Sequence, residues 1–142
     1  MSDIDQLGPR QRNSAPILIA EDSALLGKLI SESLVRAGYS NLTMTMNGQE
    51  AWDKLNQFKE EGTLDQKVKL IITDIEMPQM DGHRLTKLVK DSHAFGHIPV
   101  VIFSSLVNEE MRKKGEALGA DAQLSKPEIG HLVEAIDEIL WK

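Results

Sequence analysis

The chain has 142 residues, which is the usual length of a single domain and enough to bury a hydrophobic core. Hydrophobic residues make up 41% and charged residues 27%, as in globular proteins, and no apolar run approaches the ~20 residues that span a bilayer. Cysteine is absent, which excludes disulfides and thiolate metal sites. A net charge of −6 and an aromatic content of 4% argue against nucleic-acid binding, and the amino terminus lacks a signal-peptide pattern. We therefore expect a cytoplasmic domain that binds neither membrane nor nucleic acid.

The chain begins with a polar segment and then alternates strand patterns with helix patterns. Residues 1–15 carry little apolar periodicity, so we expect a linker or disordered tail there, followed by one domain over residues 16–142. Short apolar runs predict five strands, at residues 16–20, 41–46, 70–72, 99–103 and 120–124. Helical spacing predicts a helix after each strand: residues 24–37, a helix ending near Gly62, one after Gly82, one capped by Asn108, and a last one with Pro127 in its first turn. Residues 63–67 are expected to be a loop.

Strands that alternate with helices in so short a chain predict an α/β fold with a parallel sheet covered on both faces. A closed barrel of eight such units needs roughly 250 residues, so the sheet is expected to be open. We predict a flavodoxin-like (βα)5 three-layer fold with the strand order 2-1-3-4-5. Ligand sites in such sheets lie at the carboxyl ends of the strands.

Polar side chains follow four of the five predicted strands. Glu21 and Asp22 follow the first strand, Asp74 the third, Ser104 the fourth and Lys126 the fifth. Three crowded carboxylates repel one another unless a hard cation such as Mg²⁺ binds their oxygens. If Asp74 attacked a phosphoryl group, Mg²⁺ and the Lys126 ammonium would offset the charge on the phosphoryl oxygens, and the Ser104 hydroxyl would donate a hydrogen bond.

These segments resemble the receiver domains of response regulators in two-component signalling. The likeness covers about residues 16–141 and rests on Glu21-Asp22, Asp74-Ile75-Glu76-Met77-Pro78, Asp81-Gly82, Ser104 and Lys126-Pro127. The sequence of residues 17–23, 76–82 and 103–106 looks most like that of the receiver domain of CheV, a chemotaxis coupling protein.

The resemblance implies a role for each site residue. Asp74 would accept a phosphoryl group from a CheA-like histidine kinase, with Ser104 as the switch hydroxyl and Lys126 as its partner. Mg²⁺ would be held by Asp22 directly, by Asp74, by Glu21 mainly through a water, and by the backbone carbonyl of Glu76. The bond from Lys126 to Pro127 would be cis. The domain would be a signalling switch in chemotaxis, and its only catalysis would be its own phosphotransfer and autodephosphorylation.

The resemblance also implies a neighbouring domain. In CheV proteins a CheW-like coupling domain precedes the receiver, so residues 1–15 would be what remains of the linker between the two domains.

Three departures from the family pattern leave alternatives open. Gln123 stands where many receivers have an aromatic switch residue, Glu21 stands where Asp is usual, and Glu76 adds a carboxylate beside Asp74. One alternative is an interaction module that works without phosphorylation. Another is a phosphohydrolase of the haloacid-dehalogenase type with Asp74 as nucleophile and Glu76 as acid, which the following Met77-Pro78 does not favour.

Two expectations concern residues outside the predicted site. Gln123 is expected to be a half-exposed strand residue. The four histidines, His83, His93, His97 and His131, are expected to be solvated.

Overall fold

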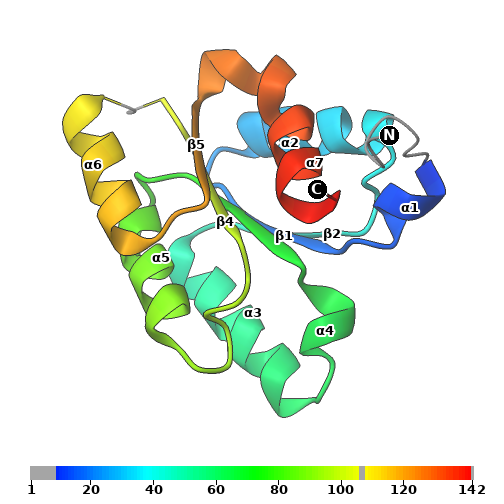
Figure 1. Cartoon of the computed structure of the whole chain (residues 1–142). Coiled ribbons are helices and arrows are strands. Elements are labelled where there is room, and N and C mark those ends of the chain that lie inside the picture. Colours follow the sequence, from blue (N-terminus) through cyan, green and yellow to red (C-terminus); the bar gives the residue numbers. More distant parts are fainter. Residues whose placement is uncertain (1–8, 106–107, 142) are drawn as a thin grey trace.

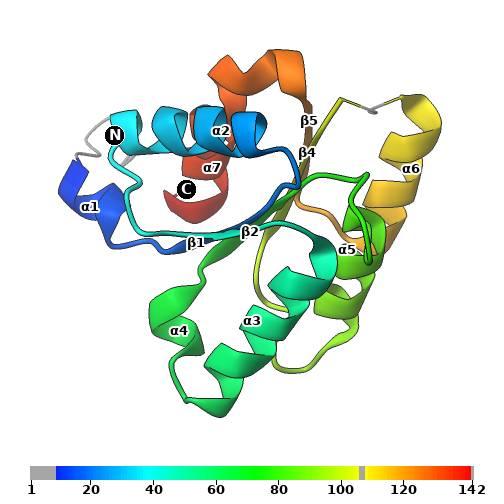
Figure 2. The ribbon, with the colours of Figure 1, turned by 180° about the vertical axis from the view of Figure 1, so that it is seen from behind.

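The computed structural model describes residues 9–105 and 108–141, which form a parallel sheet with helices on both faces (Figures 1 and 2). The strands are β1 (Ile17–Ala20), β2 (Leu42–Thr45), β3 (Leu70–Thr73), β4 (Val100–Ser104) and β5 (Ala122–Ser125). The α-helices are α1 (Pro9–Asn13), α2 (Ala24–Ala37), α3 (Gly48–Glu60), α4 (Leu64–Lys67), α5 (Gly82–Asp91), α6 (Glu109–Leu118) and α7 (Leu132–Trp141), and the 3-10 helix η2 (Lys126–His131) precedes α7. The strand order β2-β1-β3-β4-β5 confirms the predicted flavodoxin-like fold.

The central strands are buried on both faces, so each one contributes side chains to two hydrophobic clusters, one on each face of the sheet. Alternate side chains of β1 and β3, such as Ile19 and Ile72, pack under α2 and α7, while Leu18 and Ile71 pack under α3 and α5. Each fully buried aliphatic side chain of this size contributes about 1.5–3 kcal/mol to folding. These two layers fix the strands rigidly and therefore fix where their carboxyl ends lie.

The helix termini follow the signals in the sequence. Ser23, Asn47 and Asn108 are N-caps whose side chains accept a hydrogen bond from a backbone amide in the first turn. Gly38 and Gly119 end α2 and α6 with left-handed backbone angles, as predicted for glycine at this position.

The structure corrects three of the expectations about local structure. The predicted loop at residues 63–67 contains the one-turn helix α4, because Val68 N–H reaches the Leu64 carbonyl. The last helix does not run continuously from Pro127: η2 comes first, and Glu128 has non-helical backbone angles inside it. Among the described residues no peptide bond is cis, so the expectation of a cis bond before Pro127 was wrong.

His83 is the exception among the histidines, since it is 4% exposed and its pKa is lowered, first by burial and then by the charge of Lys114. The N-terminal segment also differs from the expected tail. Residues 9–13 are helical and Arg12 binds Asp137, whereas residues 1–8 lie outside the described residues.

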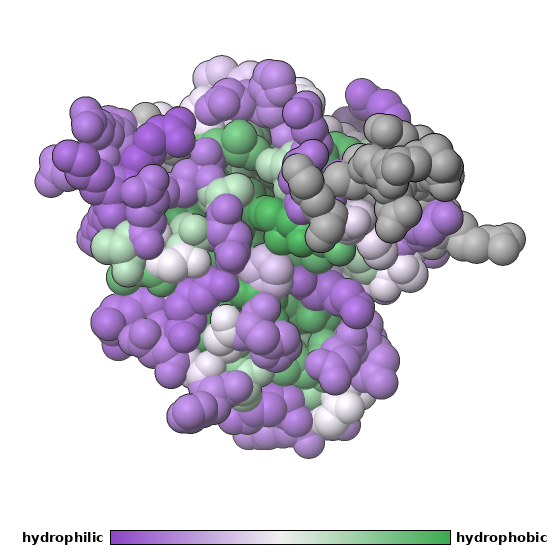
Figure 3. All heavy atoms as spheres, in the orientation of Figure 1, coloured by the Kyte–Doolittle hydropathy of each residue, from purple (hydrophilic) through white to green (hydrophobic). Residues whose placement is uncertain are grey.

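The face of the domain drawn in Figure 3 is mostly hydrophilic. Figure 3 shows hydrophilic residues over the helices and hydrophobic residues mainly in the recesses between them. Within residues 9–105 and 108–141, no helix has the length and apolar character needed to cross a bilayer.

Candidate functional site

The candidate site forms where β1 and β3 end side by side. Ala20 and Thr73 are partners in the parallel register, and the Asp74 amide donates to the Ala20 carbonyl at 3.0 Å. The next residue of each strand is a carboxylate, Glu21 or Asp74, and both are buried. The sheet therefore delivers two carboxylates to one edge, as the sequence predicted.

Asp74 is held in place by hydrogen bonds from the residues on either side of it. Its Oδ1 accepts a hydrogen bond from the Ile75 amide at 2.6 Å, and its own carbonyl accepts one from the Thr73 hydroxyl at 2.8 Å. Only 6% of the residue is exposed. These contacts fix the orientation of the carboxylate, which a nucleophile needs if it is to meet its target without reorganisation.

The loop after Asp74 packs closely against the backbone of Asp74 and Ile75. Gly82 N–H donates to the Ile75 carbonyl at 2.8 Å, and a Cβ on Gly82 would lie 1.8 Å from the Asp74 carbonyl oxygen. Further along, Gly48 N–H of α3 donates to the Met80 carbonyl at 3.0 Å. Glycine at position 82 is therefore required by the close approach of the two backbones.

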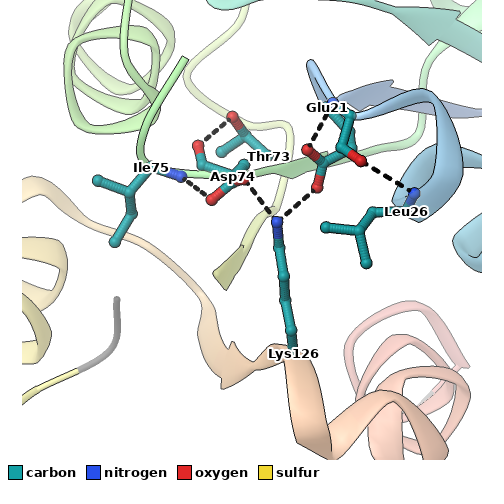
Figure 4. Close-up of polar contacts among 7 residues, drawn as sticks. Glu21, Leu26, Thr73, Asp74, Ile75 and Lys126 are labelled. Atoms are coloured by element: carbon teal, nitrogen blue, oxygen red, sulfur yellow. Dashed lines mark hydrogen bonds and ion pairs between the residues drawn. The ribbon is translucent and has the colours of Figure 1, made fainter. Parts of the chain in front are cut away.

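Lys126 reaches from the start of η2 to a position between the two buried carboxylates (Figure 4). Its Nζ lies 2.8 Å from Asp74 Oδ2 and 3.0 Å from Glu21 Oε1, and 14% of its side chain is exposed. Burial by itself lowers the pKa of Lys126, but the contacts with Asp74 and Glu21 raise it more, so the net direction is upward. The ammonium therefore stays charged at neutral pH and balances part of the negative charge.

Glu21 has one satisfied oxygen and one that is not satisfied. Oε2 accepts a hydrogen bond from the Ser23 amide at 3.1 Å. Oε1 forms an ion pair with Lys126 at 3.0 Å but accepts no hydrogen bond from the described residues. Burial, and to a lesser degree the charge of Asp74, raise the pKa of Glu21. A cation at this oxygen would relieve both effects.

The residues present fit a divalent metal ion. Glu21, Asp22 and Asp74 each offer a carboxylate oxygen, and these oxygens lie within 4.8 Å of one another. Mg²⁺ prefers oxygen ligands and keeps several waters, which suits a cluster in which Asp22 is exposed and the other two residues are buried. The unsatisfied Glu21 oxygen is the observation that supports this fit most directly.

The other predicted site residues lie at different depths. Ser104 ends β4, is fully buried and is the register partner of Ser125, the residue before Lys126, so it lies at the same edge of the sheet. The Glu76 side chain is exposed and is not part of the acidic cluster, so any role as a ligand falls to its backbone carbonyl. Gln123 is half-buried in β5, as expected, and its side chain donates to the Arg112 carbonyl of α6 at 2.8 Å.

Sequence reasoning missed the groups that position Asp74. The Thr73 hydroxyl and the Ile75 amide each donate a hydrogen bond shorter than 3 Å to Asp74. Gly82 has no side chain, which lets its amide donate to the Ile75 carbonyl at 2.8 Å. The Asp81-Gly82 pair signalled a turn, but no sequence pattern indicated that the turn folds back onto the Asp74 backbone.

Taken together, the structure is a doubly wound α/β domain that presents buried carboxylates and a lysine at the carboxyl edge of its sheet. A family model, the response regulator receiver domain, matches residues 17–137, and the chain belongs to that family. Domains of this family are switches in two-component signalling.

The similarity to CheV-type proteins is also confirmed. The chain is 35% identical over 136 residues to the chemotaxis protein CheV3 of Helicobacter pylori, an alignment that covers 94% of this chain and 43% of CheV3. The chain therefore spans less than half the length of that relative.

Solved structures show the same fold. The chemotaxis protein CheY4 of Vibrio cholerae superposes with a TM-score of 0.75 at 26% identity, covering 89% of this chain and 98% of that one. The receiver domain of the histidine kinase CKI1 from Arabidopsis thaliana, in complex with Mg²⁺ and BeF3⁻, superposes with a TM-score of 0.77 at 26% identity, covering 96% and 98%.

Proposed function

We propose that this domain accepts a phosphoryl group on Asp74 from a CheA-like histidine kinase and acts as a phosphorylation-dependent switch in chemotaxis. The observation that carries the proposal is the contact of Lys126 with both Asp74 and Glu21 at the end of two adjacent strands. A structural salt bridge would need one carboxylate, whereas this site crowds a second one, and its buried Glu21 Oε1 has an ion pair with Lys126 but no hydrogen bond.

In the proposed transfer, a carboxylate oxygen of Asp74 forms the bond to phosphorus while the phosphorus–nitrogen bond of the donor phosphohistidine breaks. The electron pair of that bond goes to the donor's imidazole, which takes up a proton. Bound Mg²⁺ would offset negative charge on the phosphoryl oxygens. Lys126 supplies a second positive charge, and the Ser104 hydroxyl is the proposed hydrogen-bond donor to the transferred group.

The site residues divide the metal binding between them. We propose that Asp22 and Asp74 bind Mg²⁺ through carboxylate oxygens, Glu76 through its backbone carbonyl, and Glu21 mainly through a metal-bound water. Hydrolysis of the phosphoaspartate by water resets the switch, so the domain turns over only its own phosphoryl group.

The proposal extends to the surroundings of the domain. The receiver comprises residues 16–142, and a CheW-like coupling domain precedes it, with residues 1–15 as the connection. Similarity to CheV3, which is more than twice as long as the aligned segment, supports this arrangement.

Phosphorylation is tested by incubating the chain with Mg²⁺ and acetyl phosphate and measuring the mass by intact mass spectrometry. We expect a gain of one phosphoryl group that disappears in EDTA and in Asp74→Asn, while Asp81→Asn, a carboxylate outside the cluster, still reacts. Labelling that persists in Asp74→Asn contradicts the assignment of the acceptor. Absence of labelling in the unaltered chain favours the alternative of an interaction module that works without phosphorylation.

A further inference from the structure

Asp137 of α7 is a buried carboxylate that lies outside the candidate site. It is 4% exposed and accepts hydrogen bonds from three donors on two other elements. Arg12 Nε and Nη2 donate to its two oxygens at 3.2 and 2.7 Å, and the Tyr39 hydroxyl donates to Oδ1 at 2.5 Å. A bidentate arginine is a strong partner for a buried carboxylate, so this contact holds α1 and α7 together.

Tyr39 and Trp141 extend the contact into a network. Tyr39 is fully buried, and its hydroxyl accepts a hydrogen bond from Trp141 Nε1 at 2.8 Å. Burial, and then the hydrogen bond to Asp137, raise the pKa of Tyr39, so the hydroxyl remains a donor at neutral pH. The Arg12 guanidinium also lies 5.9 Å from the centre of the Tyr39 ring, within the range of a cation–π interaction.

Arg12 belongs to α1, which precedes β1 and is no part of the five strand–helix units. Besides Asp137 it binds the Ala37 carbonyl at the end of α2 at 3.3 Å. The adjoining Asn13 accepts a hydrogen bond from Ser40 in the loop after α2. Figures 1 and 2 both show α1 at the end of the molecule where α2 and α7 meet. The N-terminal segment is therefore docked on α7 and on the end of α2 through polar contacts.

The helix on which α1 docks, α7, is connected through η2 to a residue of the candidate site. Lys126 is the first residue of η2, and η2 leads directly into α7, which carries Asp137. Phosphorylation converts the Asp74 carboxylate into an acyl phosphate, which moves the negative charge onto the phosphoryl oxygens and adds about one further negative charge beside the Lys126 ammonium. The Asp74 oxygen that Lys126 contacts is altered by the transfer, and η2, with its non-helical residue Glu128, is the segment that joins Lys126 to α7.

We propose that α7 and the end of α2 form a docking surface for the chain's own residues 9–14, and that phosphorylation of Asp74 loosens this docking through Lys126, η2 and α7. This inference rests on the proposed function. It assigns the Arg12–Asp137 pair as the contact by which the state of Asp74 reaches whatever lies N-terminal to the receiver. Because coupling between two sites is reciprocal, undocking the segment favours the phosphorylated state by the same factor.

The test uses amide hydrogen exchange, with Mg²⁺ and beryllofluoride as the phosphoryl mimic. The reporters are the Ser14 and Ala15 amides, which donate to the Gln11 and Arg12 carbonyls at 3.1 Å. We expect the mimic to accelerate exchange at these amides about fivefold, the lower end of usual allosteric coupling. In Arg12→Gln exchange is already fast and does not respond, and the variant binds the mimic about fivefold more tightly.

Two further variants serve as a control and as a conservative substitution. Arg36→Gln removes an exposed arginine from the last turn of α2 and should behave like the unaltered chain. Arg12→Lys keeps the charge but loses the bidentate geometry, so it should give intermediate exchange, and it replaces Arg12→Gln if that variant does not fold.

The outcomes separate the two proposals. If the mimic protects residues 74–76 but leaves exchange at Ser14 and Ala15 unchanged, or if Arg12→Gln binds the mimic with unchanged affinity, the docking proposal is wrong and the proposed function stands. If the mimic protects nothing near Asp74, the proposed function fails and the docking proposal fails with it.

Discussion

Replacing Lys126 with methionine removes the positive charge between two buried carboxylates and keeps most of the side-chain volume. At separations of 2.8 and 3.0 Å and an effective dielectric of ~20, each ion pair has a Coulomb energy of about 6 kcal/mol before desolvation is counted. Loss of one partner from a buried pair costs about 3–5 kcal/mol in net stability. Because 14% of the Lys126 side chain is exposed, we expect Lys126→Met to lower the free energy of unfolding by about 3 kcal/mol.

Urea unfolding in EDTA measures this loss, and Mg²⁺ then tests its cause. A bound cation substitutes for part of the missing charge, so Mg²⁺ should stabilise the variant by about 1 kcal/mol more than it stabilises the unaltered chain. Lowering the pH should also stabilise the variant. The raised pKa of Glu21 means that the folded state binds more protons than the unfolded state above pH 4.5, so the stability of the variant should increase as the pH falls from 7 toward 4.5.

Lys87→Met is the matched control, because Lys87 is paired with Asp91 at 3.1 Å on the surface, where such pairs contribute about 0.5 kcal/mol. The reasoning is refuted if Lys126→Met is as stable as Lys87→Met in EDTA, or if Mg²⁺ stabilises both equally. Either result would mean that the two carboxylates are not held against their mutual repulsion by this lysine.

Three other predictions use the same purified chain. Asp22→Asn should weaken Mg²⁺ binding more than Glu21→Gln does, because only Asp22 is expected to bind the ion directly; a calorimetric titration with equal losses would reject that order. Gly82→Ala should cost about 3 kcal/mol in urea unfolding, because its methyl group would overlap a backbone carbonyl, whereas Gly130→Ala, where a Cβ meets nothing within 4 Å, should cost less than about 1 kcal/mol. The lowered pKa of His83 means that the unfolded state binds its proton more readily, so stability should fall as the pH drops below about 6.5, and His83→Gln should flatten that slope; parallel slopes from pH 8 to 5 would contradict it.

The proposed regulation and the proposed chemistry depend on the same residue. Lys126 balances the charge of Glu21 and Asp74, and it also begins the 3-10 helix that leads into α7. In the proposed regulation, a change in charge at Asp74 acts through Lys126 and η2 on α7, which holds the N-terminal segment. In the proposed regulation, the switch would act on the N-terminal segment without an aromatic residue at position 123.

The sequence by itself determined the architecture and the membership of the candidate site. Uninterrupted apolar runs predicted buried parallel strands, and a carboxylate, serine or lysine directly after a run was expected at the carboxyl edge. The structure has the predicted strand order and brings Glu21, Asp74 and Lys126 into contact. Such predictions succeed because burial of a strand and the identity of the residue that follows it are local properties of the chain.

Only the tertiary structure decided how the site is held and what it is attached to. The docking of Arg12 on Asp137 joins residues 125 positions apart, and the burial of His83 depends on how α5 and α6 pack. The fit of Gly82 against Asp74 likewise depends on the path of a loop. None of these contacts leaves a periodic signal, because each is set by which surfaces meet after the sheet has formed. Composition suggested a loose tail before residue 16, but the structure places part of that segment against a buried carboxylate, which is a strong partner for an arginine.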